Sequence, residues 1–179
     1  MLFPELSKPL FHGSDVAVDH VDLSQSAPRK DFGRGFYTTN DKAQAEKFAR
    51  LKANRSHSGL AHVSVFSYGE TEDLCIKRFE SSGKDWLDFV LRNRGYGRYS
   101  DSAQDEFYDI VIGPVADDAV GVVLNLFVTG TYGDPDTTEA KETAIRLLLA
   151  QKLYNQIYFG TELSLRHLIH VETYDVHLD

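Results

Sequence analysis

The sequence is poor in cysteine and in long apolar runs, and each shortage excludes a class of protein. Cys75 is the only cysteine among 179 residues, so an internal disulfide is impossible, which agrees with a reducing compartment. The apolar stretch 120–128 is shorter than the roughly 20 residues that span a bilayer, and Asn125 interrupts it. The first residues lack the basic and apolar blocks of a secretory signal. We therefore expect a cytoplasmic protein with no membrane association.

Positive charge is also scarce. The chain has 19 Lys and Arg against 27 Asp and Glu, a net charge of -8 at pH 7. Such a balance repels polyphosphate backbones and disfavours a nucleic-acid partner. A local basic groove remains an alternative, although a solvated helix face and loop is the favoured interpretation of its residues. That groove would use Arg50, Lys52, Arg55, Arg92, Arg94 and Arg98.

Several catalytic and metal-binding motifs are missing. The sequence contains no GxxxxGK[ST], HExxH, CxxC or GxSxG segment. His167 and His170 lie three residues apart but lack a third ligand at metal spacing, so we expect no bound metal. Gly33 and Gly35 form a GxG pair without the third glycine of a dinucleotide-binding turn, and an extended segment follows where a Rossmann helix would begin.

What is present is the composition of an ordinary globular domain. With 42% hydrophobic and 26% charged residues, the chain is close to soluble averages, and its length suits one domain over 1–179. Apolar spacing predicts an α+β fold without regular βαβ alternation. We expect a strand that ends at 12–14, strands at 35–39, 62–68, 107–115, 156–159 and 170–177, and helices at 41–53, 83–94 and 138–152. The segment 117–128 is a helix or a strand, 161–168 is helical or looped, and Trp86 is expected in the core.

Three short segments resemble one enzyme superfamily. LFHGS at 10–14 resembles the LWHGS-type segment of poly(ADP-ribose) polymerases and their diphtheria-toxin-like relatives, and DFGRGFYTT at 31–39 is similar to their FGKGIYFAD-type segment. NQIYF at 155–159 resembles their NEYIVY-type strand, with Gln156 at the position of the catalytic glutamate. The ordered motifs imply the ADP-ribosyltransferase fold, a β-sheet core split in two with flanking helices. They also resemble a group of small bacterial proteins suspected to be toxins of toxin–antitoxin pairs.

The resemblance implies roles in binding and cleaving NAD as a substrate. His12 would hydrogen-bond the adenosine ribose, and Tyr37 and Phe48 would stack on the cationic nicotinamide, an attraction of about 1 to 2 kcal/mol once desolvated. The backbone of Gly13 can supply the donor and the acceptor that the carboxamide needs. Four further residues complete the expected site: Ser14, Gly35, Phe36 and, as a carboxylate near the ribose, Glu162.

Gln156 makes this chain depart from the glutamate form of the superfamily. A carboxylate stabilises the oxocarbenium charge that develops when the glycosidic bond breaks, and a neutral amide cannot. Gln156 can still orient a ribose hydroxyl, while Glu162 is the nearest carboxylate if the strand turns back over the site. The departure favours single transfer over chain elongation.

We therefore expect a mono-ADP-ribosyltransferase, an intracellular bacterial toxin with an antitoxin partner and a macromolecular acceptor, protein rather than RNA or DNA. The alternatives are an NAD glycohydrolase or phosphorylase and a binding module with weakened catalysis. Each residue also has a structural interpretation: His12 as a hydrogen-bonded structural histidine, Tyr37 as a strand aromatic of the core, and Glu162 as a surface or capping residue. Phe48 would extend a buried stripe with Ala45 and Ala49. The segment around Asp109, with Asp117 and Asp118, is interpreted mainly as a structural strand and turn.

Overall fold

The computed structural model describes residues 3–69, 73–96, 107–115, 118–150 and 153–178. Within them the chain forms two sheets and five α-helices, which confirms the α+β class and a sheet core split in two. The strands are β1 (Leu10–Ser14), β2 (Phe36–Thr38), β3 (His62–Tyr68), β4 (Ile76–Arg78), β5 (Ile110–Val115), β6 (Tyr154–Phe159) and β7 (Leu168–Asp175). The helices are α1 (Lys42–Ser56), α2 (Lys84–Asn93), α3 (Asp118–Val128), α4 (Thr138–Leu149) and α5 (Glu162–Leu165), with a 3-10 turn at Leu23–Gln25.

One sheet has the strand order β1-β3-β7, and the other has the order β2-β6-β5-β4. Neighbouring strands are antiparallel except β4 and β5, which are parallel. The sheets meet where Phe11 of β1 and Thr39 exchange two backbone hydrogen bonds of 2.8 and 2.9 Å. This junction brings the first two sequence motifs, in β1 and β2, side by side.

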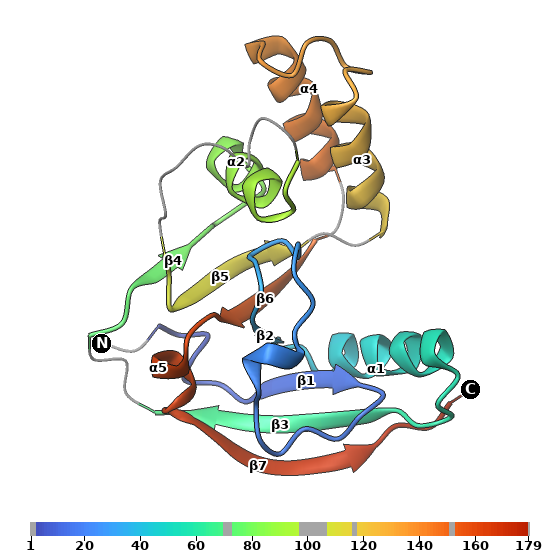
Figure 1. Cartoon of the computed structure of the whole chain (residues 1–179), viewed down its shortest axis with the longest axis vertical. Coiled ribbons are helices and arrows are strands. Elements are labelled where there is room, and N and C mark those ends of the chain that lie inside the picture. The colour runs from blue at the N-terminus through green and yellow to red at the C-terminus, as the bar shows by residue number, and fades with distance from the viewer. Residues whose placement is uncertain (1–2, 70–72, 97–106, 116–117, 151–152, 179) are drawn as a thin grey trace.

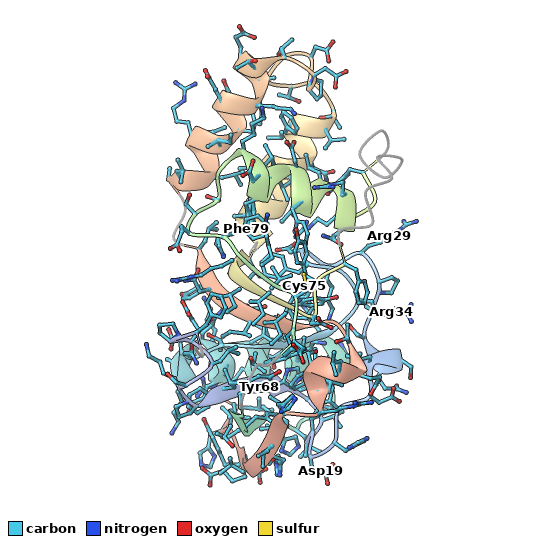
Figure 2. All side chains as sticks on the ribbon, turned by 90° about the vertical axis from the view of Figure 1, so that its left-hand side faces the viewer. Asp19, Arg29, Arg34, Tyr68, Cys75 and Phe79 are labelled. Atoms are coloured by element: carbon cyan, nitrogen blue, oxygen red, sulfur yellow. The ribbon has the colours of Figure 1, made fainter. Side chains whose placement is uncertain are left out.

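The helices are distributed unequally over the two sheets. Helices α2, α3 and α4 gather at one end, beyond the four-stranded sheet, whereas α1 lies along β1 (Figure 1). Trp86 and Phe127 belong to the core under the three gathered helices. Phe79 belongs to the same core, whereas Tyr68 belongs to a second core between the sheets (Figure 2). Trp86 is fully buried, as the sequence predicts.

The start of helix α1 is determined by its N-cap, and its packing is determined by its alanines. The Asp41 side chain accepts a hydrogen bond from the N–H of Gln44 at the helix start. Ala45, Ala49 and Ala53 are buried against β1 and β3. Because alanine is small, the helix approaches β1 closely, and this contact defines one wall of the site described below.

The structure corrects several expected details. His12 lies in the middle of β1 rather than at its end, because the strand continues to Ser14 opposite β3. The segment 118–128 is helical, with Val120 and Leu124 on its buried side. Strand β4 was not expected, since its three residues carry almost no pattern. None of the described helices is long and apolar enough to cross a membrane.

Candidate functional site

Three residues that the motifs single out line one cavity of about 410 Å³. They are His12 of β1, Tyr37 of β2 and Gln156 of β6, so the site draws on both sheets. Gly13 and Phe48, also expected in the site, line the same cavity. The cavity therefore gathers segments that lie far apart in the sequence.

His12 is held in one tautomer. Its Nδ1 lies 2.7 Å from the carbonyl oxygen of Tyr37, and because a carbonyl only accepts, Nδ1 must carry the proton. Burial lowers the pKa of His12 to about 4, with the positive charges of Lys30 and Lys52 acting in the same direction. Neutral His12 therefore has an unprotonated Nε2, which can accept a hydrogen bond from a ligand hydroxyl. Its ring packs against Phe36 at a centroid distance of 4.4 Å.

Tyr37 holds the loop that precedes it. Its hydroxyl donates to the carbonyl of Gly33 at 2.8 Å and accepts from the N–H of Phe32 at 3.1 Å. Burial raises the pKa of this phenol, so it stays neutral. The ammonium of Lys30 lies 4.9 Å from the ring centroid. This contact demonstrates that the ring can interact with a cation inside the cavity.

Phe48 and Gln156 both line the cavity with side chains that are available to contact a ligand. Phe48 is 40% exposed, so the buried stripe of α1 consists of alanines and does not include it. Lys52, one turn further along α1, lies 5.9 Å from the Phe48 ring centroid. The amide of Gln156 makes no hydrogen bond to the residues that the structure describes. Stacking and polar groups are therefore available together in this cavity.

Gly13 combines a packing role with an open backbone edge. A Cβ atom at this position would lie 2.0 Å from the carbonyl oxygen of Ala45, so only glycine allows α1 to lie so close. The N–H and C=O of Phe11 point toward Thr39, and in an antiparallel ladder alternate residues point their backbone groups to the same edge. The N–H and C=O of Gly13, two residues beyond Phe11, therefore point to the same edge of β1, away from β3. The cavity lies at this edge.

A second cavity of about 390 Å³ adjoins the first. The two share four lining residues: His12, Lys30, Tyr37 and Lys52. The expected site residues Ser14, Gly35 and Phe36 line this second cavity and not the first. The motifs thus contribute residues to two neighbouring cavities, and His12 and Tyr37 line both.

The second motif also has clear packing functions. A Cβ at Gly35 would lie 2.2 Å from the ring of Tyr158, so a side chain there is excluded. Both backbone groups of Gly35 are hydrogen-bonded to the hydroxyl of Ser26. Phe36 is 7% exposed and contacts Phe66 in the core. These two residues shape and support the site, and their own groups are largely engaged.

Glu162 is not brought to these cavities. It is an exposed residue in the first turn of α5, whose cap is formed by Thr161 and Ser164. It lines a separate cavity of about 210 Å³ beside Asp19 and Arg166. Asp109 has the structural role expected of it, because its carboxylate accepts hydrogen bonds from Cys75 N–H and the Thr161 hydroxyl. Asp117 lies outside the described residues.

Five charged residues also line the first cavity, and sequence reasoning placed none of them with His12, Tyr37 and Gln156: Arg29, Lys30, Asp31, Lys52 and Arg94. Asp31 is 6% exposed and forms an ion pair of 2.6 Å with Arg94, which follows α2. Lys30 precedes Asp31, and Lys52 lies on α1. Lys52 and Arg94 belong to the suggested basic groove, and Asp31 to the second motif, but only the fold brings them to one place.

Arg29 lines the first cavity, and Arg34 follows it in the same loop between β1 and β2. Figure 2 places both on the same side of the molecule, pointing outward. Arg50 and Arg92 donate instead to the carbonyls of His177 and Asp88, and Arg98 lies outside the described residues. Part of the suggested basic groove is therefore an element of the cavity wall, and part is ordinary surface.

Among the described residues, no group of three or more His, Cys, Asp or Glu side chains is placed to hold a metal ion. A search of curated proteins and a search of solved structures each found no significant match. A family model described as "Protein of unknown function (DUF3990)" matches residues 9–170, a span that contains β1 to β6 and both cavities. The chain therefore belongs to the DUF3990 family.

Proposed function

We propose that this protein transfers a single ADP-ribose from NAD to a macromolecular acceptor and releases nicotinamide. The observation that carries the proposal is that His12, Tyr37 and Gln156 line one cavity. These are the residues that the three motifs align with the His-Tyr-Glu set of ADP-ribosyltransferases. A chance resemblance of three short segments would not require their side chains to meet.

The nicotinamide end of NAD fits the first cavity. The ring stacks on Tyr37, with Phe48 on α1 as the second aromatic at the cavity wall. The carboxamide bonds to the open backbone edge of Gly13, which offers one donor and one acceptor. The ribose that follows bonds through a hydroxyl to Nε2 of His12 or to the amide of Gln156.

The transfer exchanges one bond at the ribose. The bond between C1′ and the nicotinamide nitrogen breaks, and nicotinamide leaves as a neutral molecule with the bonding electrons. The acceptor's nucleophile bonds to C1′ and loses its proton to solvent or to a neighbouring base. Gln156 orients the ribose without stabilising its positive charge. Asp31 is the carboxylate that lines this cavity, and its ion pair with Arg94 weakens its field, so slow single transfer is the expected chemistry.

The biological role that suits this activity is that of an intracellular bacterial toxin, cytoplasmic and neutralised by an antitoxin protein. The net charge of -8 favours a protein acceptor over RNA or DNA. Expression of the wild type should arrest growth, whereas His12→Ala should not. Equal growth of the two strains would contradict the toxin role.

Isotopically labelled NAD, incubated with the protein and a cell lysate, tests the transfer directly. The wild type should label a macromolecule, and His12→Ala and Tyr37→Ala should reduce the labelling at least tenfold. His177→Ala, at an exposed histidine that lines neither cavity, is the matched control. Labelling that persists in both cavity variants would refute the proposal.

Two other functions of the same cavity are separated by the same assay. Consumption of NAD without a labelled macromolecule would indicate hydrolysis or phosphorolysis, with water or phosphate as acceptor. The unpaired, neutral Gln156 supports a binding module as the second candidate, and NAD binding in calorimetry without any turnover would establish it.

A further inference from the structure

The two cavities share a wall that carries two lysines, Lys30 from the loop before β2 and Lys52 from α1. We propose that Lys30 and Lys52 form a diphosphate subsite, so that a dinucleotide extends from the first cavity past these lysines into the second. The inference rests on the proposed function for the identity of the dinucleotide. It adds the residues that hold the diphosphate and the place of the second nucleoside.

The positive charges at this wall are only weakly compensated by the protein: the charge of Lys52 acts on Asp15 and helps to lower the pKa of that carboxyl. Among the described residues, neither lysine has a carboxylate within ion-pair distance. Asp31 in the same cavity is already paired with Arg94. Burial and the charge of Lys52 lower the pKa of Lys30, which means that burying its ammonium has a free-energy cost. A bound dianion would remove that cost by pairing with both lysines.

The position of Lys30 also explains how a ligand would engage it. Its ammonium lies over the Tyr37 ring, 4.9 Å from the centroid. A nicotinamide cation that stacks on this ring face takes the place of the ammonium, and the flexible lysine side chain then needs another partner. A diphosphate attached to the same ligand supplies it. Stacking at one end of the dinucleotide is therefore coupled to ion pairing at its centre.

The second cavity suits the remaining nucleoside. Its wall includes the apolar side chains of Val18, Val21, Leu23 and Phe36, which can contact a flat base. His12 belongs to both cavities, so its Nε2 acceptor is within the path of the ligand between them. The volumes of about 410 and 390 Å³ are each in the range of small-ligand pockets, and together they suit a dinucleotide.

Calorimetry with ADP-ribose, inorganic pyrophosphate and nicotinamide tests the subsite on the full chain. Lys30→Met and Lys52→Met should each weaken ADP-ribose and pyrophosphate binding about tenfold, and the double variant by more, because each substitution removes a charge-assisted hydrogen bond to the diphosphate. Nicotinamide, which lacks the diphosphate, should bind the Lys52→Met variant as it binds the wild type. Lys47→Met, on the exposed side of α1 and outside both cavities, is the control.

The outcomes separate this inference from the proposed function. ADP-ribose binding that is unchanged in both lysine variants would overturn the subsite and leave the proposed function intact. Pyrophosphate binding that depends on both lysines, without NAD or nicotinamide binding, would support an anion site and contradict the proposed function. Absence of binding by all of these ligands would overturn both.

Discussion

His12 illustrates how one side chain is set by its surroundings. The carbonyl of Tyr37 fixes the proton on Nδ1, and burial keeps the ring neutral with a pKa of about 4. The histidine is therefore an acceptor at Nε2 throughout the physiological pH range, and its contribution to ligand binding should not change between about pH 6 and 8.

The same pKa shift predicts a pH dependence of stability. The folded pKa of about 4 lies below the ordinary histidine pKa of 6.5, so the unfolded chain binds the proton first as the pH falls. Stability contributed by neutral His12 is complete above about pH 6.5 and is lost as the pH falls toward about 4. Between pH 7 and 5 we expect the free energy of unfolding, measured with urea, to fall by about 2 kcal/mol in the wild type. The His12→Gln variant should not show this loss. Equal losses of stability in the wild type and in His12→Gln would show that His12 does not cause the pH dependence.

Tyr37 has two functions that mutation can separate. Its hydroxyl ties the loop through Phe32 and Gly33, whereas its ring faces the cavity. Tyr37→Phe should lower the free energy of unfolding by about 1 to 2 kcal/mol, because the Phe32 N–H loses its acceptor. Nicotinamide affinity, measured by calorimetry, should change less than threefold in Tyr37→Phe and fall at least tenfold in Tyr37→Ala. Equal affinities of the Phe and Ala variants would show that the ring does not stack.

At the scale of elements, the approach of α1 to β1 decides the shape of the site. The alanine face of α1 and the absence of a side chain at Gly13 bring the helix against the strand. This packing brings Phe48 and Lys52, which lie beside the alanine stripe on α1, to the cavity. The glycines of the motifs are thus needed for packing whatever ligand is bound.

Substitution of these glycines should destabilise the fold. Gly13→Ala and Gly35→Ala each place a Cβ within 2.2 Å of other atoms, and overpacking costs about 1 to 3 kcal/mol, or more against backbone. Thermal and denaturant unfolding measure the effect. Gly121→Ala, inside α3 with its nearest neighbour at 3.8 Å, should instead stabilise by up to about 1 kcal/mol. Unchanged stability of Gly13→Ala would contradict the close packing.

At the scale of the whole molecule, the site lies between the two sheets. His12 belongs to the three-stranded sheet, and Tyr37 and Gln156 belong to the four-stranded one. In the described residues the sheets are joined through the bridge of Phe11 and Thr39 and through the core between them. A ligand in the cavities therefore contacts residues of both sheets.

Ligand binding should stabilise the molecule as one unit. At a concentration one hundred times its Kd, ADP-ribose should add about 2.7 kcal/mol, which corresponds to a rise in Tm of about 5 to 11 °C for a chain of this size. Calorimetry should show a single transition that moves as a whole. Two transitions, of which only one moves, would mean that the sheets unfold independently.

Much of the fold could be predicted because local patterns carry it. The alternation in 62–68, the alanine-rich helix after Asp41 and the buried Trp86 follow from side-chain periodicity and capping, which act over a few residues. The sequence could not decide whether 118–128 is a helix or a strand, since a short apolar run suits a buried helix and a strand equally well. Strand β4 owes its conformation to pairing with β5, a contact that its own residues do not encode.

The sequence by itself determined the α+β class, most of the helices and strands, and the motif residues His12, Tyr37 and Gln156, because these depend on local periodicity and on short ordered segments. Only the tertiary structure decided that the three line one cavity, that Glu162 lies elsewhere, and that Lys30, Asp31, Lys52 and Arg94 join the site. The physical reason is that cavity walls are made by contacts between distant segments. Such contacts depend on sheet register and on the distance between α1 and β1, which no single stretch of sequence specifies.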